Sequence, residues 1–242
     1  MIRSIFASLA AVLAVSVLGA QGCKQSGVGD PCIPEQEYDT TFNGFNPNEV
    51  NVESKSFQCQ TRLCLVNHFR GRVTCPYGQN SDGTGLPTVD SATGGPFPQS
   101  DANCPADNPQ CITRCAIPGG DPTKGSDQIT GILDAQGNPI DPKVAATVEP
   151  QCVDREAANT VYCSCRCANA DGKTDDGANY CSCPDGFTCS QLINPIGGTG
   201  GNIELAGAYC IKKDTEFQAY GACTLPCDPT LPSQNCAPPS IR

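Results

Sequence analysis

Nineteen cysteines in a chain of 242 residues constrain its fold more than any other feature of the sequence. Cysteine at this density is typical of oxidising compartments, where disulfide bridges compensate for a small apolar core. The number is odd, so at least one cysteine has no partner within the chain and requires a separate explanation. The first question is therefore which cysteine differs from the others.

The N-terminus has the layout of a secretory signal peptide. Arg3 is the only charged residue among the first 22, and the apolar run 5–18 follows it and ends in small residues. A positive start, an apolar stretch of about 7–15 residues and a small-residue exit mark a segment that is removed on export. The run is shorter than the roughly 20 residues that span a bilayer. We therefore expect residues 1–22 to be a signal peptide, with an uncleaved anchor or a buried helix as the alternatives.

Cys23 stands where this segment ends, and the polar stretch 24–30 separates it from Cys32. If Cys23 carries a lipid, 18 cysteines remain, which is enough for nine bridges. The position of Cys23 and the odd number of cysteines thus point independently to the same residue. We predict lipidation of Cys23, cleavage between Gly22 and Cys23, and a flexible tether over residues 23–31.

The residues around this bond resemble a bacterial lipobox, the site at which diacylglycerol is added to a cysteine before cleavage. The resemblance rests on Ala20, Gln21, Gly22 and Cys23. The family usually has Leu at the first of these positions and a small residue at the second, so the sequence departs from the pattern at Ala20 and Gln21. The same residues also resemble an ordinary signal peptidase site, which implies a secreted or periplasmic protein cut at the same bond. Lys24 resembles the enterobacterial sorting signal for the outer membrane.

Charge and composition restrict both the partners and the source of stability. Without residues 1–22 the chain has 14 basic and 25 acidic residues, a net charge of −11. This balance excludes the basic footprint of a nucleic-acid-binding protein and attachment to anionic lipid by charge, so a membrane link has to come from the anchor. Leu, Ile, Val and Phe make up only 36 of the 220 residues that follow the signal peptide, and Trp is absent. Bridges that each contribute roughly 2–4 kcal/mol therefore have to stabilise the fold.

The other cysteines fall into two groups, separated by a cysteine-free loop at 116–151. The first cysteine-rich lobe, 32–115, has seven cysteines and the second, 152–242, has eleven. An odd number of cysteines cannot all form bridges within one lobe, so we predict that at least one bridge joins the two lobes. One free thiol in each lobe, or an intermolecular bridge, are the alternatives. The functional interpretation is one rigid platform from which 116–151 projects as a loop available to partners.

The sequence predicts a small disulfide-rich fold with mostly short β-strands and irregular loops, and little helix after the signal peptide. Short segments that contain Val, Tyr and Phe between turn residues are typical of strands. Because side chains alternate along a strand, Cys163, Cys165 and Cys167 would share a sulfur-lined face. Cysteines two apart on one strand are poorly placed to bridge each other, so their partners should lie in other segments. The expected strands are 49–57, 63–68, 72–75, 161–167, 180–183 and 203–212.

Two resemblances extend this interpretation. The segment 181–189, CSCPDGFTC, resembles the C-terminal half of an EGF-like module, a type that usually mediates binding or spacing. The chain as a whole resembles the cysteine-rich lipoproteins of predatory delta-proteobacteria (myxobacteria). That second resemblance is carried by GVGDPC near the anchor, YCSCRC, CSCPDGFTC and GAYCIK. It implies an address in the cell envelope and implies no activity.

Residues that could carry chemistry are few. His68 is the only histidine, so any Ser-His-Asp or Cys-His arrangement has to use it. The cysteines around it match no common zinc spacing, and no C-x-x-C motif occurs. The turn from Asn169 to Asp176 is similar to a calcium loop, but two of the expected ligand positions hold Cys167 and Ala178. We therefore expect no catalytic residue, metal or cofactor, with calcium near Asp171 to Asp176 left open.

These observations favour a non-enzymatic, lipid-anchored protein of the cell envelope, with the outer membrane as its expected location. Its role would be structural or binding, with a protein or glycan at the cell surface as a possible partner. A secreted, disulfide-stapled inhibitor or ligand is the first alternative. A cryptic hydrolase is the second.

Overall fold

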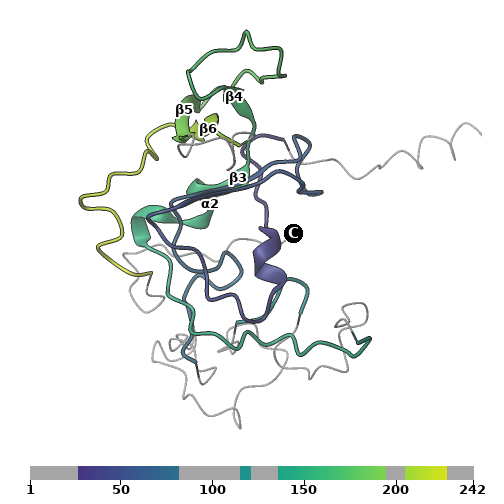
Figure 1. Cartoon of the computed structure of the whole chain (residues 1–242). Coiled ribbons are helices and arrows are strands. Elements are labelled where there is room, and N and C mark those ends of the chain that lie inside the picture. Colours follow the sequence, from purple (N-terminus) through teal and green to yellow (C-terminus); the bar gives the residue numbers. More distant parts are fainter. Residues whose placement is uncertain (1–26, 82–114, 121–135, 195–204, 228–242) are drawn as a thin grey trace, which may run out of the picture.

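The computed structural model describes residues 27–81, 115–120, 136–194 and 205–227 (Figure 1). In these residues the predicted fold class is confirmed, because the structure consists of two small antiparallel sheets, irregular loops and seven disulfides. The elements in chain order are η1 (Glu35–Tyr38), β1 (Val50–Glu53), β2 (Cys64–Asn67), η5 (Val153–Arg155), α2 (Ala157–Thr160), β3 (Val161–Cys163), β4 (Arg166–Ala168), β5 (Phe187–Ile193) and β6 (Gly207–Lys212).

The first sheet has the strand order β1-β2-β3, and both of its pairs are antiparallel. Leu65 on the central strand lies opposite Val52 on one side and Tyr162 on the other. β3 follows the cysteine-free loop, so both cysteine-rich lobes contribute strands to this sheet. The disulfide Cys59–Cys163, with a Cα–Cα distance of 5.4 Å, joins the lobes and confirms the predicted bridge between them.

The second sheet has the strand order β4-β6-β5 and is also antiparallel. The predicted single strand over 161–167 is wrong, because the chain leaves the first sheet after Cys163 and enters the second at Arg166. Ser164, at the crossing, is fully buried. Its N–H donates to the carbonyl of Leu63 in the first lobe, and its hydroxyl donates to the carbonyl of Cys210 on β6 at 2.7 Å. These two bonds hold the sheets together at the point where the chain passes between them.

Other predicted strands have different outcomes. The segments 49–57, 63–68 and 203–212 contain β1, β2 and β6, whereas 180–183 has no regular structure. The segment 72–75 is a turn, closed by the N–H of Cys75 donating to the carbonyl of Arg72 at 3.1 Å. β5 was not predicted, because apart from Phe187, Leu192 and Ile193 its residues are polar or cysteine.

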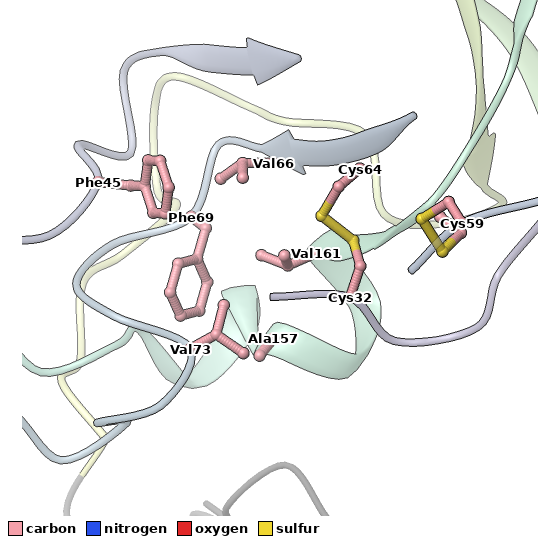
Figure 2. Packing of buried hydrophobic residues seen from close by; sticks show 10 residues of the cluster. Cys32, Phe45, Cys59, Cys64, Val66, Phe69, Val73, Ala157 and Val161 are labelled. Atoms are coloured by element: carbon pink, nitrogen blue, oxygen red, sulfur yellow. A yellow bond between two sulfur atoms is a disulfide. The ribbon is translucent and has the colours of Figure 1, made fainter. Parts of the chain in front are cut away.

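Side-chain alternation builds an apolar layer on one face of the first sheet (Figure 2). Val66 and Val161 from adjacent strands point into this layer, where Phe69 and Val73 pack against them. Four half-cystines complete it: Cys32, Cys59, Cys64 and Cys163. Covalent bridges thus stand where a larger protein would place further Leu or Ile side chains.

The opposite face of the first sheet packs against the second sheet. Leu65 and Tyr162 come from the first sheet, and Tyr209 and Ile211 come from β6. The ring of Phe187 on β5 meets the Tyr162 ring edge-on, with centroids 5.7 Å apart. The backbone N–H of Lys212 donates to the Tyr162 hydroxyl at 2.9 Å, so the polar end of this buried ring is also satisfied.

The far face of the second sheet is lined with sulfur, which confirms the prediction for Cys165 and Cys167; the prediction that Cys163 shares this face is wrong, because Cys163 ends β3 and packs in the apolar layer of the first sheet. Its buried members are Cys165, Cys167, Ala168, Ala208 and Cys210. Partly buried Cys181 and Cys183 pack against them from the preceding loop, together with Val28. From one side to the other, the described molecule therefore consists of an apolar layer, a sheet, a mixed layer, a second sheet and a layer of cystines.

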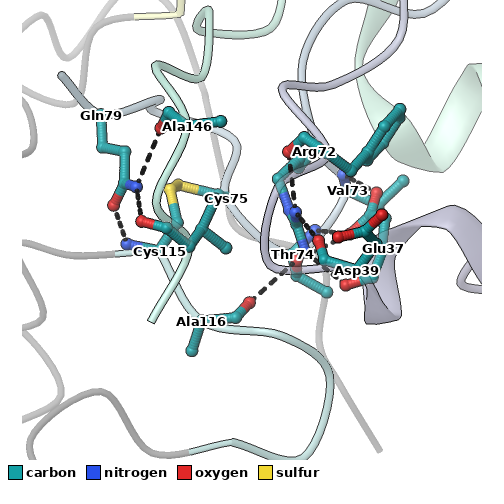
Figure 3. Close-up of a disulfide and its surroundings, with 12 residues drawn as sticks. Glu37, Asp39, Arg72, Val73, Thr74, Cys75, Gln79, Cys115, Ala116 and Ala146 are labelled. Atoms are coloured by element: carbon teal, nitrogen blue, oxygen red, sulfur yellow. Dashed lines mark hydrogen bonds between the residues drawn. A yellow bond between two sulfur atoms is a disulfide. The ribbon is translucent and has the colours of Figure 1, made fainter. Parts of the chain in front are cut away.

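The described parts of the stretch 116–151 correct the expectation of a projecting loop. Ile117 and Val148 are almost fully buried, and they pack with Val144 beside the Cys75–Cys115 bridge. The carboxamide of Gln79 ties this region together, because it accepts from the N–H of Cys115 and donates to two carbonyls of the 144–146 segment (Figure 3). Val148 also forms an isolated antiparallel bridge with Gln79.

Two fully buried charged side chains lie near the same bridge (Figure 3). The Glu37 carboxylate accepts from the N–H groups of Val73 and Thr74 and from the Thr74 hydroxyl. The Arg72 guanidinium donates to the main-chain carbonyls of Glu37, Asp39 and Phe42. Burial raises the pKa of Glu37 above its ordinary value, although these hydrogen bonds and Arg72 act in the opposite direction. No sequence pattern distinguished these two residues from solvent-exposed charges.

Candidate functional site

The predicted lipidation and cleavage residues, Cys23 and Gly22, lie outside the described residues, which begin at Gly27. Residues 27–30 form a turn in which the Asp30 carboxylate accepts from the N–H of Gly27 at 2.7 Å. The N–H of Asp30 donates back to the carbonyl of Gly27 at 3.1 Å. This turn starts the anchor junction, by which we mean residues 27–32, where the chain emerging from Cys23 joins the folded body.

The anchor junction is docked against β3 and β5. The N–H of Gly29 donates to the carbonyl of Cys163, and the N–H of Cys163 donates to the carbonyl of Asp30, both at 2.8 Å. Gly29 has a φ of 94°, and a Cβ atom there would lie 2.7 Å from the Phe187 ring, so both conformation and space require glycine. The Cys32–Cys64 bridge then fastens the junction to β2. The predicted flexible tether over 23–31 is therefore corrected, because 27–31 are ordered on the body.

This docking limits the distance between Cys23 and the folded body. Only residues 24–26 separate Cys23 from Gly27. An extended chain covers at most about 3.6 Å per residue, so the Cα atoms of Cys23 and Gly27 cannot be more than about 14 Å apart. A lipid on Cys23 would therefore hold this end of the molecule directly at a membrane surface.

The pairing of the other cysteines narrows the choice of the cysteine that has no partner within the chain. Each of the fifteen cysteines that the structure describes is disulfide-bonded. Seven bridges account for fourteen of them, and Cys227 is bonded as well. Since every other described cysteine is already paired, Cys227 needs its partner among Cys23, Cys104, Cys111 and Cys236. That leaves three of the nineteen, so at least one of these four cannot be bridged within the chain.

His68 has a packed, structural environment. It is half-buried, its Nδ1–H donates to the carbonyl of Pro47 at 2.8 Å, and its ring stacks on Phe217 with centroids 3.9 Å apart. Arg155 lies beside it and donates to the main-chain carbonyls of Asn67, His68 and Thr215. Burial lowers the pKa of His68 below its ordinary value, and the charge of Arg155 acts in the same direction. The roles of Arg155 and Phe217 carry no recognisable signal in the sequence.

The cysteines near His68 in the sequence are not available as metal ligands. Cys59, Cys64 and Cys75 each belong to a different disulfide. Within the described residues, every group of side chains close enough to share an ion includes cysteines that are bonded in bridges. A metal binds the thiolate form of cysteine, so these groups act as covalent cross-links.

The acidic turn between β4 and β5 is organised by its own hydrogen bonds. The Asn169 side chain accepts from the N–H groups of Asp171 and Lys173, and it donates to the Asp176 carboxylate at 3.0 Å. The same carboxylate accepts from the Tyr180 hydroxyl at 2.7 Å. These bonds lower the pKa of Asp176 to about 2, with the Tyr180 hydroxyl as the largest cause. The Asn169 and Asp176 side chains are thus bonded to each other.

The segment that resembles an EGF-like module, 181–189, does not close on itself. All three of its cysteines are bonded to residues outside it: Cys181 to Cys165, Cys183 to Cys210 and Cys189 to Cys167. The segment is instead part of the cystine layer of the second sheet. No protein-family model, curated protein or solved structure matches this chain. In the parts of the chain that the structure describes, none of the helices has the length and apolar character needed to cross a membrane.

Proposed function

We propose that this protein is a non-enzymatic lipoprotein of the bacterial cell envelope, anchored by a lipid on Cys23 and with a structural or binding role at the membrane surface. The observation that carries the proposal is the leftover cysteine. At least one of four cysteines has to lie outside the intramolecular bridges, and Cys23 is the one that directly follows a signal-peptide pattern. Lipidation of Cys23 explains both its position after the signal-peptide pattern and the odd number of cysteines.

The anchor junction supports this proposal. A lipid-bearing residue has to be followed by a chain that reaches the folded body, and here that chain is only residues 24–26. The body begins with a turn at 27–30 that is hydrogen-bonded to β3 and covalently fastened at Cys32. Such a short link suits a protein that works at the membrane itself. Lys24 favours the outer membrane as the location.

A binding role finds support in the exposed aromatic side chains. Phe57 and Tyr220 are 79% and 97% exposed, which is unusual for rings of this size. The guanidinium of Arg62 lies over the Phe57 ring, 4.4 Å from its centroid. Aromatic and Arg side chains are enriched where proteins recognise partners, and a surface protein or glycan is the partner class that we propose.

The secreted, disulfide-stapled ligand remains the second candidate, since Ala20, Gln21 and Gly22 also resemble an ordinary signal peptidase site. Fractionation of cells that express Cys23→Ser separates the two. We expect the wild-type protein in the membrane fraction and Cys23→Ser in the soluble fraction. Gln25→Ser is the matched control, because it changes the tether without touching the anchor, and it should stay with the membrane. Full retention of Cys23→Ser by the membrane would show that the lipid on Cys23 is not the anchor.

A further inference from the structure

Three disulfides of the second sheet lie close to one another and form a sulfur cluster. Its members are the bridges Cys165–Cys181, Cys183–Cys210 and Cys167–Cys189. The Sγ atom of Cys210 lies 3.7 Å from that of Cys165 and 3.6 Å from that of Cys181, at the contact distance of two sulfur atoms. The central bridge, Cys183–Cys210, is thus packed directly against the inner bridge, Cys165–Cys181.

The central bridge, Cys183–Cys210, also lies next to the outer bridge, Cys167–Cys189. The Sγ atoms of Cys167, Cys183 and Cys189 are all within 4.8 Å of one another. Cys183 therefore has two close sulfur neighbours in addition to its bonded partner, Cys210. Since a disulfide is exchanged by attack of a thiolate on one of its sulfurs, this spacing brings the three bridges within reach of exchange.

The backbone allows a second set of bridges at the same positions. Cys189 on β5 lies directly opposite Cys210 on β6. Opposite residues of an antiparallel pair have Cα atoms about 4.5–5.5 Å apart, within the roughly 4.4–6.8 Å that a disulfide accepts. These two cysteines are nevertheless bonded elsewhere. A cross-strand bridge Cys189–Cys210 would leave Cys167 and Cys183, whose sulfur atoms are already close, to bond each other.

Solvent reaches this cluster from one end. Cys189 is exposed, whereas Cys167 is 7% exposed and Cys210 is completely buried. A thiol in solution can therefore attack the outer bridge at Cys189. In the first sheet the bridges Cys32–Cys64 and Cys59–Cys163 also lie close together, but all four of those residues are buried. Among the residues that the structure describes, only the second sheet combines closely spaced disulfides with a solvent-exposed cysteine.

We propose that the sulfur cluster is a thiol–disulfide exchange site that isomerises between two sets of bridges, with an external low-molecular-weight or protein thiol as the catalyst. The external thiolate bonds to Cys189 and releases the Cys167 thiolate. Cys167 then attacks Cys183, forms Cys167–Cys183 and releases the Cys210 thiolate. Cys210 turns toward its cross-strand neighbour, attacks Cys189 and releases the external thiolate. Two bridges have formed and two have broken, with no net oxidation or reduction.

The isomerisation changes what the β5–β6 hairpin is fastened to. In the described state Cys189 bonds the hairpin to β4, and Cys210 bonds it to the loop before β5. In the second state the two cysteines bond each other, and the hairpin keeps no disulfide to the rest of the sheet. The β5–β6 hairpin, with Phe187 and Leu192 on the layer between the sheets, would then be held to β4 only by the pairing of β6 with β4 and by packing, and could separate from it. The cluster is thus a conformational switch that responds to thiols.

Peptide mapping distinguishes the two states directly. The purified mature protein is incubated with reduced glutathione at mildly alkaline pH, quenched in acid and digested with trypsin and Asp-N without reduction. These enzymes release 185–212 as one peptide that contains both Cys189 and Cys210. In the described state it is linked to the peptides of Cys167 and Cys183. In the second state it is released alone, with one internal bridge.

We expect the free, internally bridged 185–212 peptide to accumulate with time of exposure to glutathione, while the remaining cross-linked species, which contains the Cys59–Cys163 bridge, loses the mass of 185–212 and keeps that bridge. The double variant Cys75→Ser/Cys115→Ser removes a bridge elsewhere and should isomerise like the wild type. The double variant Cys167→Ser/Cys189→Ser removes the outer bridge and should keep 185–212 linked to the peptide of Cys183. A wild-type protein that starts and stays in one of the two states, or that releases 185–212 only with both cysteines reduced, overturns the proposal.

Discussion

At the scale of single residues, the polar side chains of this protein serve mainly to bond the chain to itself. Arg72 and Arg155 are buried and donate to main-chain carbonyls, as Lys and Arg seldom do at a solvated surface. The acidic side chain of Asp176 is fully exposed, yet it too accepts bonds from within its own turn. Sequence patterns identify such residues only by type, and their partners come from distant segments or from turn geometry.

The Tyr180 hydroxyl should be the main reason that Asp176 is so acidic. In Tyr180→Phe the carboxylate keeps its bonds to Asn169 and to the N–H of Ala178 but loses the strongest donor. We expect the pKa of Asp176 to rise from about 2 toward its ordinary value of 3.8, as measured by NMR titration of the side-chain carboxyl. An unchanged pKa in Tyr180→Phe would mean that the turn does not hold Asp176 as described.

His68 should make stability depend on pH in the mildly acidic range. Its pKa is lowered in the folded state, so below the ordinary value of 6.5 the unfolded chain binds a proton that the folded protein does not. Stability contributed by neutral His68 is therefore fully present above 6.5 and is lost as the pH falls from 6.5 to the lowered pKa. His68→Phe retains a ring to stack on Phe217 and should show a flatter pH profile in urea unfolding. Equal slopes in both proteins would contradict this prediction.

At the scale of secondary-structure elements, the sequence was informative about the class of structure and less so about its pairing. Short apolar segments between turn residues located β1, β2 and β6, and in the structure β2 and β6 are buried on both faces. The division of 161–167 between two sheets depends on Ser164, whose bonds to Leu63 and Cys210 are long-range. The anchor junction was missed for the same reason, since its order depends on contact with β3 and Phe187.

The Cys59–Cys163 bridge is the element-level contact on which the first sheet most depends. It joins β3 to the first lobe across 104 residues, the largest separation among the seven disulfides. In the chain-entropy model a loop of this length corresponds to about 4.7 kcal/mol, against about 3 kcal/mol for a loop of about 15 residues. We expect Cys59→Ala/Cys163→Ala to lower the free energy of unfolding by about 4 kcal/mol, and Cys165→Ala/Cys181→Ala by less. Denaturant titration of both variants measures the difference, and the reverse order would contradict the prediction.

At the scale of the whole molecule, the disulfides determine how the two sheets are packed, and the anchor junction determines which end would lie at a membrane. Two three-stranded sheets enclose a single mixed layer, and cystines supply much of the packing on their outer faces. Figure 1 shows β4, β5 and β6 toward one end and the residues around 136–150 toward the other. The anchor junction packs beside the second sheet through Val28, so a lipid on Cys23 would place that end of the molecule at the membrane. The end that carries Ile117 and Val148 would then face away from it.

The central claim is that Cys23 is the leftover cysteine because it carries the lipid. The most direct test is the intact mass of the protein extracted from membranes under non-reducing conditions, with free thiols blocked by an alkylating reagent. We predict the mass of residues 23–242 plus acyl chains, with all 18 other cysteines in bridges and no alkylated thiol. A chain without acyl mass, or one with an alkylated thiol at Cys23, would contradict the account.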